Sequence, residues 1–341
     1  MQNIMVTGGA GFIGSEFARS MVEKYPNYKI VVFDKLTYAG NLDNLLPISD
    51  NPNYAFVRGD ITDHDAVERA LTEHQIDTIV NFAAESHVDR SILNPDAFIQ
   101  TDVVGVYVLL ESARKLGVNR FHHVSTDEVY GSIPDGFFRE GDPLEPNSPY
   151  AASKTGGEMM VRAYNVTYGM HTSVTRASNT FGPYQYPEKI APFFITEALD
   201  DRPLPLYGDG MQVRDWLYVG DHCDAIDTVL HKGAPGSIYN IAGEHEMHNI
   251  DLTHFILQAL DKPETLIRHV ADRPGHDRRY ALNNDKIREE LGWSQKHTFE
   301  EAMAATVEWY KKNEWWWRKI KTGEYLEFYK AQYAERLETT E

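Results

Sequence analysis

Short runs of apolar residues alternate with longer amphipathic stretches through the first half of the chain. Residues 4–6, 30–33, 54–57, 78–82 and 121–124 read as buried strands, and residues 13–24, the stretch after Asp63 and residues 95–116 read as helices. A strand, a helix and a second strand in that order form a βαβ unit with parallel strands. Repetition of this unit predicts an α/β fold, with a doubly wound parallel sheet covered by helices on both faces.

The second half follows a less regular pattern. A long helix is expected from after Ser148 to about Tyr168, followed by a strand at residues 172–176. Beyond Asn179 proline and glycine punctuate the chain, as in loops that build a binding pocket. No low-complexity linker separates the halves. We therefore expect one domain over residues 1–179, to which some later segments return, and a smaller, interleaved α/β domain mainly over residues 180–341.

The charge balance limits the partners of the chain. With 33 Lys and Arg against 51 Asp and Glu, the formal net charge is −18, which repels a phosphate backbone and argues against nucleic acid. A small phosphorylated molecule needs only a few cations and backbone donors and stays possible. The aromatic run of Trp309, Tyr310 and residues 315–317 is accordingly read as a packing helix rather than a base-stacking surface.

Two further features concern the compartment. The single cysteine, Cys223, cannot form an internal disulfide and has no motif around it, so a small semi-buried residue in a reducing compartment is expected. The first apolar run is short and has no basic segment before it, so neither a signal peptide nor a membrane span is predicted. These features indicate a soluble, cytoplasmic protein without membrane partners.

A glycine-rich turn joins the first strand to the first helix. The sequence TGGAGFIG at residues 7–14 places glycines at positions 8, 11 and 14. Gly8 permits a tight turn, Gly11 lets the backbone approach a pyrophosphate, and Gly14 allows close helix–strand packing. Glycine turns also occur here without a ligand, but the strand–turn–helix setting and the positive helix N-terminus favour a Rossmann-type dinucleotide site.

The ends of the next two strands bear on the choice of dinucleotide. Asp34 ends the second strand, where a carboxylate accepts hydrogen bonds from the adenosine ribose and repels a 2′-phosphate, so NAD is favoured over NADP. The neighbouring Lys35 argues against that choice unless it points to solvent. Asp60 and Ile61 are candidates to flank the adenine, although capping of the next helix explains Asp60 equally well.

A tyrosine and a lysine offer acid–base chemistry. Tyr150 and Lys154 lie one turn apart on the long predicted helix and share a face. An ammonium group lowers the pKa of a nearby tyrosine, which makes the phenolate a usable base for an alcohol that is being oxidised. Such a pair also arises by coincidence on helix surfaces, but here it follows a complete nucleotide-binding half and a proline-rich loop.

An acidic pair, Asp127 and Glu128, follows the fifth strand, where ligands bind in an open parallel sheet. Adjacent residues of a strand point to opposite faces, so both serve one site only if the chain turns there, which Gly131 permits. Elimination of water across C5 and C6 of a hexose needs a base and an acid, and C5 is acidic only when C4 is a ketone. The alternative is a pair of solvated loop acids.

With these motifs in place, the chain resembles the dTDP-glucose 4,6-dehydratases of the extended short-chain dehydrogenase/reductase family, over nearly its whole length. The resemblance includes residues 34–41, 83–89, 187–189 and 272–280. It implies that Tyr150, assisted by Lys154 and with Thr126 near C4, oxidises C4 with NAD. Glu128 then removes the C5 proton and Asp127 protonates the leaving hydroxyl. NAD is regenerated within each turnover, and a homodimer through residues 95–116 and 150–168 is implied.

The resemblance also assigns binding residues. The cofactor set, with Tyr150 and Lys154, is Gly8, Gly11, Phe12, Ile13, Gly14, Asp34, Lys35, Thr37, Asp60, Ile61, Ala83, Ala84, Thr101 and Thr180. The substrate set is Ser86, Thr126, Asn179, Lys189, Ile190, Pro205, Tyr207, Arg214, Asn249, Arg273 and His276, and no metal is expected. Taken singly, each cation is more often a surface residue and Tyr207 equally a core tyrosine. Thr180 and Ala151 depart from the Asn and Ser expected there.

Three other functions remain open. A nucleotide-sugar 4-epimerase or decarboxylase shares the fold but needs no acid–base pair for C5–C6 elimination. A dehydratase for UDP-, GDP- or CDP-linked sugars differs only in pocket contacts that a motif does not specify. A non-catalytic NAD-sensing protein is expected to lack Tyr150, Lys154 or the acidic pair.

Overall fold

A seven-stranded sheet forms the centre of the larger lobe of the computed structural model, which describes residues 1–329 and 332–333. All of its strands are parallel, in the order β10-β6-β5-β4-β1-β2-β3. Successive strands are added in one direction from β1 to β3 and in the opposite direction from β4 onward. The point between β1 and β4 is therefore a topological switch point, where ligands bind in such sheets. The strands are β1 (Asn3–Thr7), β2 (Lys29–Asp34), β3 (Tyr54–Arg58), β4 (Thr78–Asn81), β5 (Arg120–Thr126), β6 (Thr172–Ala177) and β10 (Ser237–Ile241).

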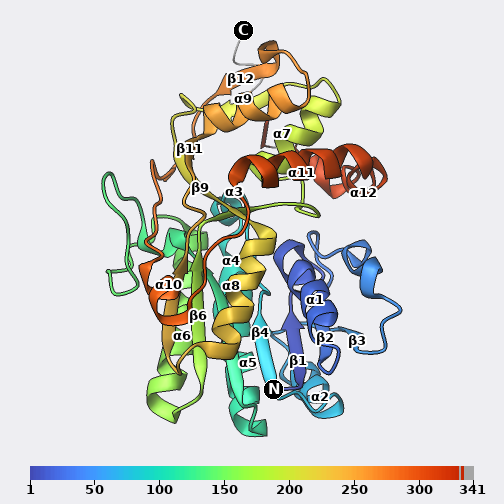
Figure 1. Ribbon diagram of the computed structural model, residues 1–341, viewed down its shortest axis with the longest axis vertical. Helices are drawn as coiled ribbons and strands as arrows, with labels where there is room; N and C mark the ends of the chain where they lie inside the picture. Colours follow the sequence, from blue (N-terminus) through green and yellow to red (C-terminus); the bar gives the residue numbers. More distant parts are fainter. Residues whose placement is uncertain (330–331, 334–341) are drawn as a thin grey trace.

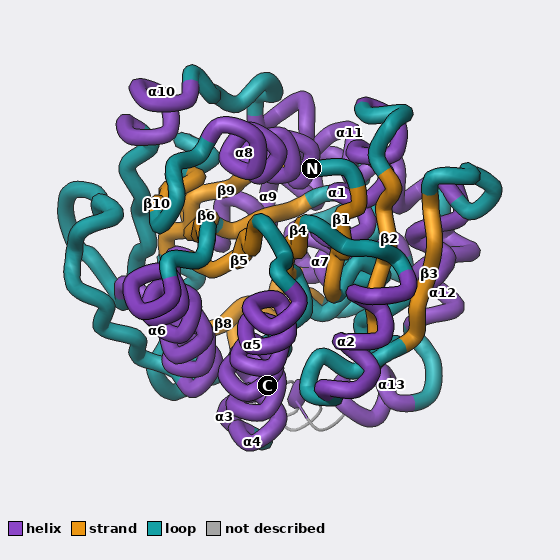
Figure 2. Tube along the Cα trace, turned by 90° about the horizontal axis from the view of Figure 1, so that it is seen from below, coloured by secondary structure: helices purple, strands orange, loops and turns teal. Residues whose placement is uncertain are grey.

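Helices cover both faces of this sheet, as the sequence predicted (Figure 2). On one face lie α1 (Phe12–Lys24), α8 (Val219–Lys232) and α10 (Asp285–Leu291); on the other lie α2 (His64–Glu73), α5 (Val106–Leu116) and α6 (Pro149–Tyr168). Apolar strand residues are buried on both sides, so Ile4 and Val6 pack under α1 while Met5 packs under the opposite helices. This two-sided burial explains why the strands read as continuous apolar runs.

The smaller lobe holds two short sheets and sits over the carboxyl ends of the large sheet (Figure 1). One sheet has the order β11-β9-β7, and the other pairs β12 with β8. Its elements are β7 (Asn179–Phe181), α7 (Ile190–Leu199), β8 (Leu204–Tyr207), β9 (Val213–Tyr218), β11 (Glu246–His248), α9 (Asn249–Ala259), η4 (Glu264–Leu266), β12 (Ile267–Val270), α11 (Phe299–Lys312), α12 (Glu314–Ile320) and α13 (Glu324–Tyr329). Since α8, β10 and α10 rejoin the large lobe, the two lobes interleave along the chain.

The helix predicted at residues 95–116 is not a regular α-helix. It consists of α4 (Pro95–Phe98), a π-helical segment η2 (Ile99–Gly105) and α5. Two glycines of α6 allow close approach here, because a Cβ on Gly157 would lie 2.3 Å from the carbonyl oxygen of Asp102. Two short elements escaped the sequence pattern, η1 (Leu42–Ile48) and α3 (Val88–Leu93), whereas η3 (Asp127–Tyr130) is the turn that the acidic pair required.

The aromatic tail is a packing element, as expected. Tyr310, Trp316 and Trp317 are fully buried, whereas Trp315 is 53% exposed. The indole of Trp316 donates to the side chain of Asn44 over 2.9 Å, which ties the tail to the larger lobe. Cys223 is a free thiol, and it is fully buried rather than semi-buried as expected. No helix in the described part of the chain is long and apolar enough to cross a membrane.

Candidate active site

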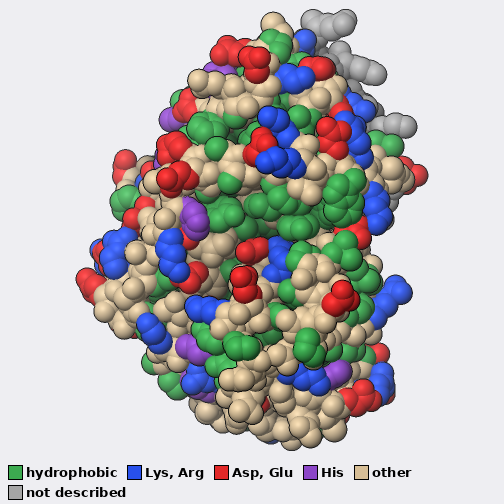
Figure 3. Space-filling model, turned by 45° about the vertical axis from the view of Figure 1, so that its right-hand side comes forward, with side chains coloured by type: hydrophobic (Ala, Val, Ile, Leu, Met, Phe, Trp, Pro, Cys, Tyr) green, Lys and Arg blue, Asp and Glu red, His purple; other side chains and the backbone are tan. Residues whose placement is uncertain are grey.

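One cavity of about 430 Å³ lies between the two lobes, above the carboxyl ends of the large sheet (Figure 3). Every residue that the sequence singled out for catalysis, cofactor or substrate lines it. The structure therefore brings together residues from both lobes, from Gly8 to His276, in a single site. Within residues 1–329 and 332–333, no group of His, Cys, Asp and Glu side chains is placed to hold a metal ion.

The glycine turn between β1 and α1 leaves room that only glycine provides. Gly8 has φ +65°, and a Cβ on it would lie 2.6 Å from the amide nitrogen of Ala83. A Cβ on Gly14 would lie 2.5 Å from the carbonyl oxygen of Gly8. Gly11 caps α1 without a side-chain bond, so the first amides of the helix stay available. This cradle fits a dinucleotide diphosphate, which binds to free N–H groups at a helix N-terminus.

The carboxylate of Asp34 closes the far end of the cradle. It accepts hydrogen bonds from the amides of Ala10 (2.9 Å) and Leu36 (2.8 Å), and burial raises its pKa. The side chain of Lys35 is 62% exposed, as the solvent-facing alternative expected, and its ammonium pairs with Asp60 over 2.6 Å. Asp60 does not cap a helix, since Asp63 caps α2 instead. The ammonium of Lys35 is thus held by a carboxylate.

Helix α6 carries Tyr150 and Lys154 into the cavity, and Ser148 caps its first turn. The Lys154 ammonium donates to the carbonyl oxygen of Val124 over 2.8 Å, and burial lowers the pKa of Lys154. The pKa of Tyr150 is not lowered in this structure, contrary to the expectation from the sequence. Burial, followed by the nearby carboxylate of Glu128, raises the pKa of Tyr150 well above its ordinary value. A sequence motif does not reveal this cost of burial.

The acidic pair occupies a turn, as its use in one site requires. Strand β5 ends at Thr126, and η3 then brings both Asp127 and Glu128 to the cavity. Thr126 accepts from the amide of Glu128 and donates to Oδ1 of Asp127 (3.1 Å). Gly131, with φ +82°, ends the turn.

The two carboxyls of this pair have different surroundings. Burial, and then the charge of Glu128, raises the pKa of Asp127 to about 8. Oδ2 of Asp127 is buried and has no hydrogen-bond partner among the described residues. Glu128 instead accepts from the hydroxyl of Tyr280 (3.4 Å) and interacts with the charges of Arg214 and Arg273. At neutral pH Asp127 therefore keeps its proton, as a general acid must.

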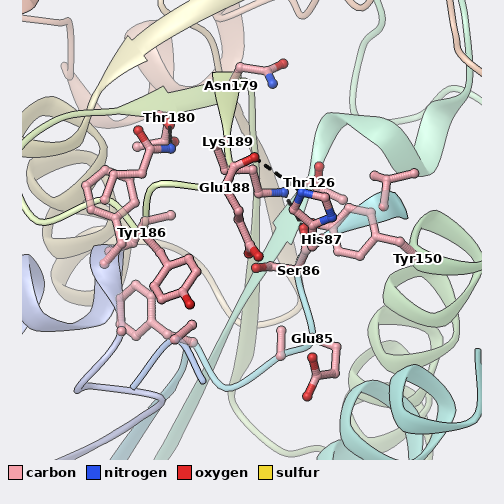
Figure 4. Close-up of a pocket in the computed structure, with 18 of the residues that line it drawn as sticks. Glu85, Ser86, His87, Thr126, Tyr150, Asn179, Thr180, Tyr186, Glu188 and Lys189 are labelled. Carbon is pink, nitrogen blue, oxygen red and sulfur yellow. Dashed lines mark hydrogen bonds between the residues drawn. The ribbon is translucent and has the colours of Figure 1, made fainter. Parts of the chain in front are cut away.

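The predicted substrate cations are held within the site and are not free surface residues. Lys189 donates to the carbonyl oxygen of Ser86, as Figure 4 shows, and burial lowers its pKa. The Arg273 guanidinium donates to Asp89 over 3.0 Å. Arg214 is buried with its guanidinium 4.3 Å from the ring centre of Tyr280. Their geometry suits the binding of a diphosphate.

Several polar side chains that line the cavity differ in whether they have a hydrogen-bond partner among the described residues. In the described part of the chain, Oδ1 of Asn179 and Oδ1 of Asn249 are buried without a hydrogen bond. Tyr207 is not a plain core tyrosine, since its hydroxyl donates to Asp89 over 3.0 Å. Thr180, where an Asn was expected, bonds to the ring of His222 over 2.9 Å. Buried polar atoms of this kind point to a polar ligand.

Sequence reasoning missed two acids, Glu85, which lines the cavity, and Asp102, which lies behind it and bonds to the Glu85 amide. Asp102, in η2, accepts from the Ser153 hydroxyl (2.6 Å) and the Glu85 amide (3.1 Å), and burial raises its pKa to about 6. Burial also raises the pKa of Glu85 to about 6. Nothing in the local pattern around Asp102 indicates this role, because its partners lie far along the chain. Glu188 lies within residues 187–189, which are part of the family resemblance, but the resemblance assigned no role to it.

Comparison with known proteins agrees with this geometry. The sequence model of the family described as GDP-mannose 4,6 dehydratase matches residues 5–306. The chain is 49% identical over 323 residues to a dTDP-glucose 4,6-dehydratase of Streptomyces niveus, covering 94% of this chain and 96% of that protein. It is 46% identical to the dTDP-glucose 4,6-dehydratase of Escherichia coli, with 94% and 97% covered.

Solved structures give the same answer. A dTDP-glucose 4,6-dehydratase of Streptomyces venezuelae, solved with NAD bound, has a TM-score of 0.92 at 49% identity, covering 94% of this chain and 100% of that one. A UDP-glucose 4-epimerase of Thermus thermophilus shares the fold at 30% identity with a TM-score of 0.85, covering 92% and 100%. Dehydratases are thus nearer in sequence than this epimerase. Of the relatives compared, the dTDP-glucose 4,6-dehydratases are the most similar to this chain. The chain belongs to the GDP-mannose 4,6 dehydratase family.

Proposed function

We propose that this protein is an NAD-dependent hydro-lyase that converts dTDP-glucose into dTDP-4-keto-6-deoxyglucose and water. The observation that carries this conclusion is that the buried carboxyl of Asp127 lies with Glu128 and Tyr150 in the cavity that also holds the dinucleotide cradle. An epimerase needs no such acid–base pair for C5–C6 elimination. The dTDP-glucose 4,6-dehydratases that the chain matches at 46–49% identity support the same substrate.

Oxidation at C4 begins the reaction. NAD supplies the hydride chemistry when bound, taking one hydride and returning it in the same turnover. The cradle of Gly8, Gly11 and Gly14 would hold its diphosphate, and Asp34 would meet its adenosine ribose. Tyr150, which lines the cavity with Thr126 and Lys154, takes the proton of the C4 hydroxyl.

Elimination follows once C4 is a ketone. Glu128 takes the C5 proton, which the neighbouring carbonyl has made acidic, and Asp127 gives its proton to the departing C6 hydroxyl. The C6 hydroxyl leaves as water and a C5–C6 double bond forms. Hydride return to C6 and proton return to C5 complete a redox-neutral cycle. The different surroundings of Asp127 and Glu128 fit these different tasks, since Oδ2 of Asp127 is buried without a partner among the described residues while Glu128 accepts from Tyr280.

We further propose that the protein acts in the cytoplasm as a homodimer. Helices α5 and α6 lie side by side and, with η2, leave large apolar side chains exposed: Ile99, Tyr107, Leu116, Met159, Val166 and Tyr168. A second copy would cover these residues in a bundle of four helices. Sedimentation of the purified protein as a monomer would contradict the dimer. The unpaired buried thiol of Cys223 agrees with a reducing compartment.

Incubation with dTDP-glucose and, separately, UDP-glucose tests the reaction. We expect mass spectrometry to show a product lighter by one water from dTDP-glucose, without added reductant, because the hydride taken from C4 returns to C6. A smaller yield from UDP-glucose would establish the base preference. An isomer of unchanged mass would favour the epimerase and remove the role given to Asp127 and Glu128.

Substitution of the acidic pair separates the steps. We expect Glu128→Gln and Asp127→Asn each to slow dehydration by about 10²- to 10⁴-fold, the usual value of a positioned acid or base. Only Glu128→Gln should also abolish exchange of the C5 proton with deuterated solvent, whereas both variants should still form the 4-keto sugar. Glu73→Gln, on the exposed side of α2, is the matched control. Full C5 exchange in Glu128→Gln would refute the assignment of the base.

A further inference from the structure

Three side chains from three distant segments meet beside the cavity, and one of them, Glu188, lines it. Tyr38 lies in the turn after β2, next to residues of the dinucleotide cradle, and Arg90 lies in α3. Glu188 lies in the connection between β7 and α7, in the smaller lobe. We name these three residues the latch, because they join the lobes across the site. None of them has a role in the chemistry described above.

The contacts within the latch form a closed triangle. The Tyr38 hydroxyl donates to one carboxylate oxygen of Glu188 over 3.1 Å, and Nε of Arg90 donates to the other over 3.2 Å. The guanidinium of Arg90 lies 3.9 Å from the ring centre of Tyr38. The side chain of Glu188 is only 2% exposed. Hydrogen bonds to a buried carboxylate are stronger than neutral ones, so this triangle resists opening.

Glu188 of the latch lines the cavity on the side of the predicted adenosine site. Glu188 lines the same cavity as Asp34, Thr37 and Gly40, which surround the adenosine end of the cradle. In Figure 4 its side chain points toward Ser86 and Glu85. A second contact reinforces the junction, since the ring of His87 meets the carbonyl oxygen of Glu188 at 3.3 Å. Parting of the lobes here would open this side of the cavity to a dinucleotide in the cradle.

The proposed reaction makes retention of the cofactor necessary. The hydride taken from C4 is returned to C6 only after water has left, so loss of the reduced cofactor between these steps ends the cycle with an unreduced sugar. We propose that Tyr38, Arg90 and Glu188 hold NAD in the site throughout turnover. The purpose of the latch rests on the proposed function, but the effect of the latch on cofactor release does not. The three are positioning residues, acting through the closure of the lobes.

Tyr38→Phe removes one hydroxyl from the latch and leaves its ring under Arg90. We expect NAD to leave this variant about tenfold faster than the wild type, the factor that corresponds to about 1.4 kcal/mol. Release is measured as bound NAD remaining at successive times after gel filtration. Tyr28→Phe is the matched control, since it removes a hydroxyl bond of 3.1 Å to His231 outside the cavity, and it should release NAD at the wild-type rate.

A turnover assay tests the consequence. With excess dTDP-glucose, pyruvate and lactate dehydrogenase, any reduced cofactor that escapes converts pyruvate into lactate. We expect more lactate per water eliminated from Tyr38→Phe and Glu188→Gln than from wild type or Tyr28→Phe. If Glu188→Gln fails to fold, as judged by circular dichroism, Tyr38→Phe still decides the question.

The outcomes separate the latch from the proposed function. Wild-type rates of NAD release in Tyr38→Phe would overturn the latch, even if dTDP-glucose is dehydrated normally. So would equally fast release from the Tyr28→Phe control. If the wild type holds NAD but does not dehydrate dTDP-glucose, while Tyr38→Phe releases NAD faster, the latch stands and the proposed function fails.

Discussion

Burial of the Asp127 carboxyl beside Glu128 is the constraint on which the site depends. Charging two adjacent carboxyls in a water-poor cavity is costly, so burial and repulsion raise the pKa of Asp127 to about 8. Glu128, one residue on, faces Tyr280 and two arginines instead. One short turn at the end of β5 thereby provides a proton donor and a proton acceptor within one site.

The topology of the large sheet determines where that turn lies. Parallel strands bring the ends of β1, β4 and β5 to one edge, where the glycine cradle, Ser86 and Thr126 meet. The smaller lobe then covers this edge, so the site lies in a cavity between the lobes. Contacts between the lobes, such as those of Glu188 with Tyr38 and Arg90, are therefore part of the function.

The sequence predicts features that depend on neighbouring residues better than features that depend on contacts between distant segments. The glycine cradle, α6 with Tyr150 and Lys154, and the turn at Asp127 follow from short motifs, and the structure has all three. The π-helical segment around Asp102 and the latch were not predictable, because each depends on partners 50 or more residues away. The raised pKa of Tyr150 was missed for a related reason, since a helix pattern does not show how deeply the folded chain buries one of its residues.

The protonation state of Asp127 tests the account most directly. Infrared spectra of the purified wild type and of Asp127→Asn, subtracted from one another, isolate the carbonyl stretch of a protonated Asp127. The account predicts that this band is present at neutral pH and disappears as the pH rises through about 8. Absence of the band at neutral pH, with Asp127 already ionised, would contradict the division of acid and base between the two carboxyls.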